Sequence, residues 1–153
     1  NSPLAQKVDE YIAAYISKNT TLQGQIGEEI AELMAKEINT TGDVLNIKIN
    51  NSGHGFNVLS FTPNKQVPTS VRVLEAKPFT GTSVELPVTN NGVQMSEEWL
   101  RAKIKDMQFH SDPTIQQIGD NLQKLLKQNK LEKFVVTVDK DLKQVIIIKL
   151  DTF

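Results

Sequence analysis

The spacing of apolar residues along the chain predicts two N-terminal helices followed by three strands. Apolar side chains recur at helical intervals over residues 3–18 and again up to about residue 38, where the Thr-Thr-Gly segment at 40–42 ends the pattern. The β-rich segments that follow lie at residues 44–49, 56–61 and 71–76. The stretch between the last two contains two prolines and predicts a hairpin loop.

The second half of the chain repeats this change from a helical to an extended pattern. Ser96 is placed to cap a helix with two glutamates in its first turn, and Asp112 precedes another helix that begins with Pro113. The chain closes with two strands, at residues 134–138 and 144–150. Their nearly continuous apolar runs are typical of strands covered on both faces. We therefore predict a single α/β domain, residues 1–153, with a mixed central sheet flanked by helices.

Composition narrows the chemistry open to this domain. The chain has no cysteine, which excludes disulfides and thiolate metal sites, and only two histidines. A bound metal would therefore depend largely on oxygen ligands, which favours Mg²⁺ or Mn²⁺. No apolar run approaches the length of a membrane span, and the N-terminal segment lacks the layout of a signal peptide, so any secretion signal is expected elsewhere.

Charge gives a weaker indication. The net charge of −1 argues against a protein that coats nucleic acid by electrostatics alone. Residues 101–133 nevertheless carry seven Lys or Arg against four Asp or Glu. This segment is either a local basic face or an ordinary solvated helix surface, and the pattern favours the latter.

Candidate chemistry lies at the end of the third predicted strand. Glu75 and Lys77 are two positions apart, so their side chains should share one face of the sheet. Hydrolysis of a phosphodiester needs a divalent cation held by carboxylates and a positive group near the attacking water or the phosphate. Glu75 suits the first role and Lys77 the second, although such a pair is commonly a solvated salt bridge. A second carboxylate is expected on the neighbouring strand, at position 57, which holds Asn.

Several short motifs in order resemble one nuclease superfamily. The segments NSGHGFNVLSF, VRVLEAK and VQMSEEWLRAKI resemble the PD-(D/E)XK nucleases, in particular the toxin domains at the C-termini of polymorphic bacterial toxins, including contact-dependent growth inhibition effectors. The upstream segment GQIGEEIA, residues 24–31, matches the helix motif G-x-x-G-E-x-x-A of that superfamily. The resemblance implies a restriction-endonuclease-like fold with a catalytic core at about 24–107, joined to N-terminal helices within 3–38 and to a C-terminal helix and two strands within 113–150.

The resemblance also assigns roles to individual residues. It implies that Glu75 is a metal ligand and that Lys77 acts on the water and the phosphate. It further implies that Glu28 completes the metal site, or its water network, from its helix. A helical wheel supports Glu29 instead, because Glu29 borders the apolar stripe of that helix, so both stay open with Glu28 preferred.

Three more positions follow from the same resemblance. Gln94 is expected to touch the water shell of the metal or the nucleic-acid backbone. His54 is expected either to contact phosphate or to stabilise its own turn. Asn57 stands where the family has a metal-binding Asp; an amide oxygen can coordinate Mg²⁺ but lacks the negative charge, so metal affinity should fall. An engineered inactivating substitution, a natural loss of activity and a misassigned motif all explain Asn57, and we favour the first.

The resemblance implies a metal-dependent endonuclease that cuts DNA or tRNA with Mg²⁺, or with Mn²⁺ or Zn²⁺. It would be the C-terminal effector released from a secreted or cell-surface protein, act in the cytoplasm of a target cell, and be blocked by a cognate immunity protein. The alternative is a non-catalytic module that binds nucleic acid or protein on a degenerate nuclease fold, which Asn57 favours. A third possibility is an immunity protein. The pair of Glu75 and Lys77 argues against it, because an immunity protein has no need for such a pair.

Overall fold

The computed structural model describes residues 2–48 and 55–151, and for residues 48 and 55–57 it describes the backbone. This part of the chain forms four helices and seven strands, which are α1 (Pro3–Ile16), α2 (Thr20–Ile38), β1 (Asp43–Lys48), β2 (Gly55–Thr62), β3 (Ser70–Ala76), β4 (Val88–Thr89), β5 (Gly92–Val93), α3 (Glu97–Gln108), α4 (Pro113–Lys127), β6 (Leu131–Asp139) and β7 (Gln144–Leu150). The predicted helices and the five longer strands are confirmed. The short β4–β5 hairpin, within a segment that had no predicted element, is an addition.

The central sheet is mixed. Among the described residues it has five strands in the order β1-β2-β3-β6-β7. The first three form the predicted antiparallel meander, whereas β6 runs parallel to β3 and β7 pairs antiparallel to β6. Parallel neighbours need a long crossover connection, and the segment with α3 and α4 provides it. The predicted α/β class with a mixed sheet flanked by helices is therefore confirmed.

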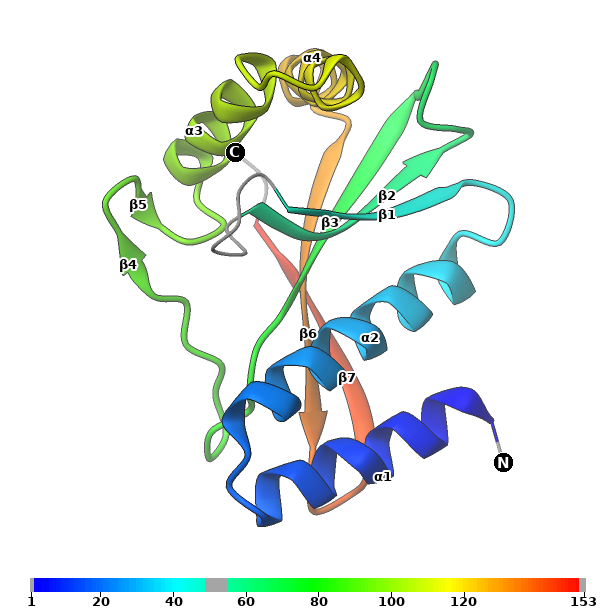
Figure 1. The fold of residues 1–153 in the computed structure, drawn as a ribbon, viewed down its shortest axis with the longest axis vertical. Coiled ribbons are helices and arrows are strands. Elements are labelled where there is room, and N and C mark those ends of the chain that lie inside the picture. The colour runs from blue at the N-terminus through cyan, green and yellow to red at the C-terminus, as the bar shows by residue number, and fades with distance from the viewer. Residues whose placement is uncertain (1, 49–54, 152–153) are drawn as a thin grey trace.

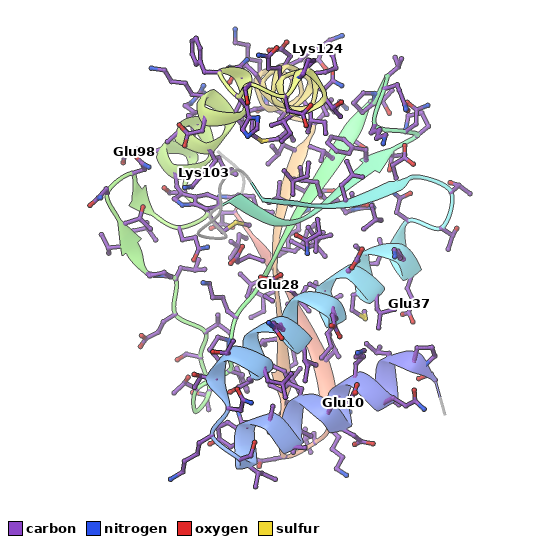
Figure 2. The ribbon with its side chains drawn as sticks, viewed as in Figure 1. Glu10, Glu28, Glu37, Glu98, Lys103 and Lys124 are labelled. Atoms are coloured by element: carbon purple, nitrogen blue, oxygen red, sulfur yellow. The ribbon has the colours of Figure 1, made fainter. Side chains whose placement is uncertain are left out.

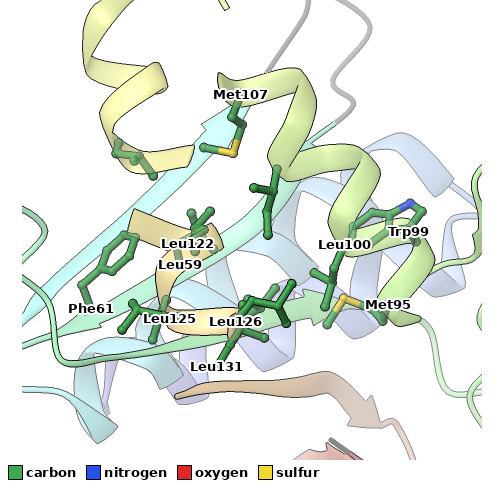
Figure 3. Packing of buried hydrophobic residues seen from close by; sticks show 14 residues of the cluster. Leu59, Phe61, Met95, Trp99, Leu100, Met107, Leu122, Leu125, Leu126 and Leu131 are labelled. Atoms are coloured by element: carbon green, nitrogen blue, oxygen red, sulfur yellow. The ribbon is translucent and has the colours of Figure 1, made fainter. Parts of the chain in front are cut away.

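The helices cover opposite faces of this sheet (Figure 1). Helices α1 and α2 pack on one face, and α3 and α4 pack on the other. Alternation along β3 explains how one strand serves both cores: Val71 and Val73 face α3 and α4, whereas Leu74 faces α1 and α2. Figure 3 shows the first of these cores, in which Trp99 is buried as expected for a core residue.

Local capping fixes where the helices begin. The Ser96 hydroxyl accepts a hydrogen bond from the backbone N–H of Trp99, and the Asp112 carboxylate accepts one from Thr114, so both predicted caps are confirmed. Pro113 occupies the first turn of α4, where a missing N–H costs no hydrogen bond.

The end of α2 is tied to the sheet through its C-cap, Asn39. The buried Asn39 amide donates to the Ser60 hydroxyl and to the Phe61 carbonyl of β2, both at 2.9 Å. The turn that follows passes so close to β2 that a Cβ on Gly42 would lie 2.2 Å from the Phe61 oxygen. Only glycine fits at position 42, and the chain therefore enters β1 in a fixed position relative to α2.

The described helices lack the features of membrane spans. Within residues 2–48 and 55–151, none combines the length and the apolar character needed to cross a bilayer.

Candidate functional site

Glu75 and Lys77 form a largely buried ion pair at the end of β3. The two side chains share one face, as predicted, and Lys77 Nζ lies 3.5 Å from Glu75 Oε1. The Glu75 side chain is only 6% exposed and that of Lys77 20% exposed. The pair is therefore not the solvated surface bridge that such a spacing usually gives. A carboxylate so far from water needs a strong reason to stay ionised.

Gln94 joins this pair from the loop between β5 and α3. Its side-chain amide nitrogen donates a hydrogen bond to Glu75 Oε1 at 2.9 Å. The amide oxygen of the same side chain is buried and has no hydrogen-bond partner among the described residues. Most buried polar groups are paired, so an oxygen left free beside a carboxylate is a natural contact for a cation or a water molecule. The structure thus brings Gln94 to the predicted site.

The loop that presents Gln94 is held by a buried lysine that the sequence argument did not single out. Lys133 of β6 donates from Nζ to the backbone oxygen of Met95 at 2.7 Å, and burial lowers the pKa of Lys133. Met95 has a φ of 70°, in the left-handed region that non-glycine residues rarely adopt. One signal could have found Lys133: it occupies an inward position between Leu131 and Val135, where an apolar residue is expected.

The electrostatic setting of Glu75 is dominated by burial. Desolvation raises its pKa from 4.5 to about 7, against the opposing effects of the Lys77 charge and of the hydrogen bonds from Lys77 and Gln94. The negative charge of Glu28 raises the pKa of Glu75 further. Near neutral pH this carboxyl therefore exchanges a proton readily, and a bound cation would compete with that proton.

Glu28, not Glu29, is the helix glutamate near the site. Glu28 is half-buried on the side of α2 that approaches β3 (Figure 2). Its negative charge raises the pKa of Glu75. Glu29 is 48% exposed and forms a salt bridge with Lys7 of α1. These contacts favour Glu28 over the helical-wheel alternative, because Glu29 is paired with α1 and Glu28 acts on Glu75. The buried face of α2 is made by Ile26, Gly27, Ile30, Ala31 and Ala35.

Two predicted site residues lie partly or wholly outside the described part of the chain. The pairing of β2 with β3 is described as far as Val58 opposite Leu74, so Asn57 and Glu75 are the next residues along the two strands. The side chain of Asn57 and the whole of His54 lie outside the described residues. The roles assigned to both stay predictions.

The described oxygen atoms fit a hard divalent cation in part. Two carboxylates, Glu75 and Glu28, and the free amide oxygen of Gln94 belong to this region. An all-oxygen set suits Mg²⁺ or Mn²⁺ better than Zn²⁺, which prefers nitrogen and sulfur. No group of three acidic or histidine side chains that could hold a metal occurs among the described residues. A further ligand would have to come from elsewhere, and position 57 is the predicted source.

Comparisons of the chain with protein-family models, with curated proteins and with solved structures find no match. The candidate site is therefore argued from its own geometry. This geometry is suited to holding a cation beside an anionic ligand. It combines a buried carboxylate, an adjacent lysine, a glutamine with a free oxygen and a second glutamate nearby.

Proposed function

We propose that this chain is a metal-dependent nuclease of the PD-(D/E)XK type, with a restriction-endonuclease-like fold, in which Asn57 replaces a metal-binding carboxylate. The single observation that carries the proposal is the buried cluster of Glu75, Lys77 and Gln94 at the end of β3. Burying a carboxylate and an ammonium is costly, and this arrangement leaves an amide oxygen unpaired as well. Such a cluster is better explained by a bound cation and an anionic substrate than by fold stability.

Each side chain then has a defined task. Glu75 and Glu28 would hold the cation, with the Gln94 oxygen as a third contact, and the bound cation would supply Lewis-acid activation of water and phosphate. Glu75 Oε1 would be oriented by the hydrogen bond that Gln94 donates and by the ion pair with Lys77. Lys77 also places a positive charge where a phosphate oxygen gains negative charge in the transition state.

The biological setting proposed here comes from the sequence resemblance. The substrate would be DNA or tRNA, and the chain would act as a toxin effector in the cytoplasm of a target cell. A cognate immunity protein would bind the site and block it. The metal affinity of this site is expected to be low while residue 57 is an uncharged Asn, because Glu75 and Glu28 are then its only carboxylate ligands among the assigned site residues.

The decisive experiment restores the expected carboxylate. The Asn57→Asp variant should cut plasmid DNA or total tRNA with Mg²⁺ or Mn²⁺, and EDTA should stop the cleavage. Adding Lys77→Met to this variant should reduce the rate by about 100-fold or more. The matched control is Asn57→Asp with Lys36→Met, which removes an exposed lysine of α2. If neither nucleic acid is cut by Asn57→Asp with any divalent cation, the nuclease proposal is wrong.

A second candidate is a non-catalytic binding module, and Asn57 is the observation that favours it. Calorimetry separates the two proposals. A nuclease site should bind Mg²⁺ more tightly after Asn57→Asp, whereas a binding module should take up no Mg²⁺ in either form.

A further inference from the structure

Thr137 of β6 carries a buried hydroxyl that has no hydrogen-bond partner among the described residues. The residue is only 2% exposed. Most buried polar groups are paired, either within the protein or with a bound molecule. Among the described side chains, the one other buried polar atom without a partner is the amide oxygen of Gln94, which belongs to the candidate site.

Strand alternation places the Thr137 side chain on the same face of the sheet as Glu75. Val136 and Val138, on either side of Thr137, face α1 and α2, where a cavity of about 190 Å³ lies. Side chains at successive positions of a strand point to opposite faces, so Thr137 faces away from these two helices. Leu74 faces α1 and α2 as well, and Glu75 next to it therefore shares the face of Thr137.

The register of the two strands brings Thr137 next to Lys77. Strands β3 and β6 run parallel with Ala76 opposite Val136, and the backbone N–H of Lys77 donates to the Val136 oxygen at 3.1 Å. Lys77 and Thr137 are the next residues along the two chains, and neighbouring strands lie about 5 Å apart. The Lys77 side chain is on the face of Glu75, with which it forms the ion pair. An ammonium and a hydroxyl are therefore neighbours on this face.

We propose that Thr137 is a further substrate-binding residue, whose hydroxyl donates to a phosphate oxygen that Lys77 also binds. This inference rests on the proposed function and deepens it. An ammonium can only donate hydrogen bonds and a hydroxyl can donate one, so the two together suit an anion. A phosphate group presents several oxygens and can accept from both donors at once.

The candidate site then has two sides. The carboxylate of Glu75 and the free oxygen of Gln94 form the side that suits a cation. Lys77 and Thr137 form the side that suits the phosphate. A phosphodiester bound here would lie beside the cation, as hydrolysis assisted by a metal ion requires.

Lys77 is the route by which an anion reaches the hydroxyl. Its side chain is 20% exposed, against 6% for the Glu75 side chain and 2% for Thr137. A lysine side chain is flexible, and its ammonium is a compact charge with rotatable donors. An anion that pairs with the exposed part of Lys77 draws the ammonium away from Glu75 and enters beside Thr137.

The binding test titrates dimethyl phosphate, a minimal phosphodiester, onto the protein in the presence of EDTA, followed by amide and threonine-methyl chemical shifts. The parent should bind it and the methyl signal of Thr137 should shift. Thr137→Val keeps the side-chain shape without the hydroxyl and should weaken binding about tenfold. Thr137→Ser should restore most of the affinity, and Lys77→Met should abolish binding.

The matched control is Ser60→Ala, which removes a buried hydroxyl that does have a partner, the Asn39 amide. Ser60→Ala should lower the melting temperature and bind dimethyl phosphate as the parent does. Thr137→Val should leave the melting temperature unchanged or higher, because it removes a polar atom without a partner. The methyl shift of Thr137 in the parent covers the case in which Thr137→Val does not fold.

Three results would overturn the proposal. The first is no binding of dimethyl phosphate by the parent, or equal affinity in the parent and Thr137→Val. The second is a lower melting temperature of Thr137→Val with unchanged binding, which would mean that the hydroxyl bonds a structural water molecule. The third is acetate binding as tightly as dimethyl phosphate, which would indicate a carboxylate of a protein partner as the occupant.

Cleavage in the Asn57→Asp background distinguishes this inference from the proposed function. If Asn57→Asp cuts and the added Thr137→Val lowers kcat/KM about tenfold, both proposals stand. If the double variant cuts as fast as Asn57→Asp, the Thr137 proposal is wrong and the nuclease proposal stands. If Asn57→Asp cuts nothing, the nuclease proposal is wrong, and the dimethyl phosphate titrations alone decide whether Lys77 and Thr137 bind a phosphate group.

Discussion

Lys133 and Met95 are joined by a buried hydrogen bond of 2.7 Å from the lysine Nζ to the methionine backbone oxygen. Because Met95 directly follows Gln94, this bond connects β6 to the loop that presents the site glutamine. Lys133 is thus a positioning residue: it acts on Glu75 through Met95 and Gln94.

The first prediction concerns Lys133→Met. The variant leaves the Met95 oxygen buried without a partner, so the free energy of unfolding should fall by about 1–3 kcal/mol, measured by urea denaturation. Lys130→Met, at an exposed position, should change it little. If Lys133 positions Gln94, the pKa of Glu75 should also rise in Lys133→Met. A stability loss with an unchanged pKa would limit Lys133 to a structural role.

The second prediction follows from the pKa of Glu75. Between pH 4.5 and 7 the folded chain holds a proton that the unfolded chain has already released, so this group lowers stability as the pH rises through that window. The rise of the pKa from 4.5 to about 7 corresponds to about 3 kcal/mol. Glu75→Gln removes this penalty. Its stability relative to the parent should increase between pH 4.5 and 7 and stay constant above about pH 7.

Urea denaturation of both proteins from pH 4 to 8.5 measures this difference, with m values checked for two-state behaviour. A stability difference that is independent of pH would mean that the pKa of Glu75 is not raised. A difference of opposite sign would mean that Lys77 and Gln94 outweigh burial.

The third prediction concerns Gln94→Leu. Its side-chain N–H stabilises the ionised form of Glu75, so its removal should raise the pKa of Glu75, measured by ¹³C NMR of the carboxyl group. Stability should change by less than about 1 kcal/mol, because the variant also removes the buried amide oxygen that has no partner. The control is Gln25→Leu, which makes the same change at an exposed position of α2 and should leave the pKa of Glu75 unchanged. An unchanged pKa would show that the hydrogen bond to Glu75 does not form in solution.

The fourth prediction uses two adjacent glutamates as a matched pair. In the Asn57→Asp background, Glu28→Gln should weaken Mg²⁺ binding, measured by calorimetry, because it removes a negative charge near Glu75. Glu29→Gln should leave Mg²⁺ affinity unchanged and affect only the exposed bridge to Lys7. Weaker Mg²⁺ binding in Glu29→Gln but not in Glu28→Gln would instead support Glu29 as the metal ligand. Equal Mg²⁺ affinities in the two variants would mean that neither glutamate of α2 holds the metal.

The features that the sequence predicts are those set by local periodicity. The helix caps at Ser96 and Asp112 and the shared face of Glu75 and Lys77 depend on neighbours within a few residues, and the structure confirms them. The α/β class follows in the same way from the order of elements. The prediction that Gln94 lies near Glu75 rested on the order of the motifs and not on a local pattern.

Features that depend on how distant elements pack could not be predicted. Whether Glu28 or Glu29 approaches the site depends on how α2 packs against α1 and the sheet, and the apolar stripe alone did not separate the two. The bond from Lys133 to Met95 links residues 38 positions apart and depends on a positive φ at a methionine, which no residue preference indicates. The cavity beside Lys77 likewise arises where α1, α2 and β6 meet.

The parallel pairing of β3 with β6 has a consequence for how the protein matures during synthesis. Every motif that resembles a nuclease is synthesised before residues 131–139, yet β6 supplies both the strand beside β3 and the lysine that fixes the Met95 loop. A nascent chain lacking this strand would leave one edge of β3 open and the Met95 oxygen without its donor. Translation alone would thus delay completion of the Glu75, Lys77 and Gln94 cluster until β6 has docked.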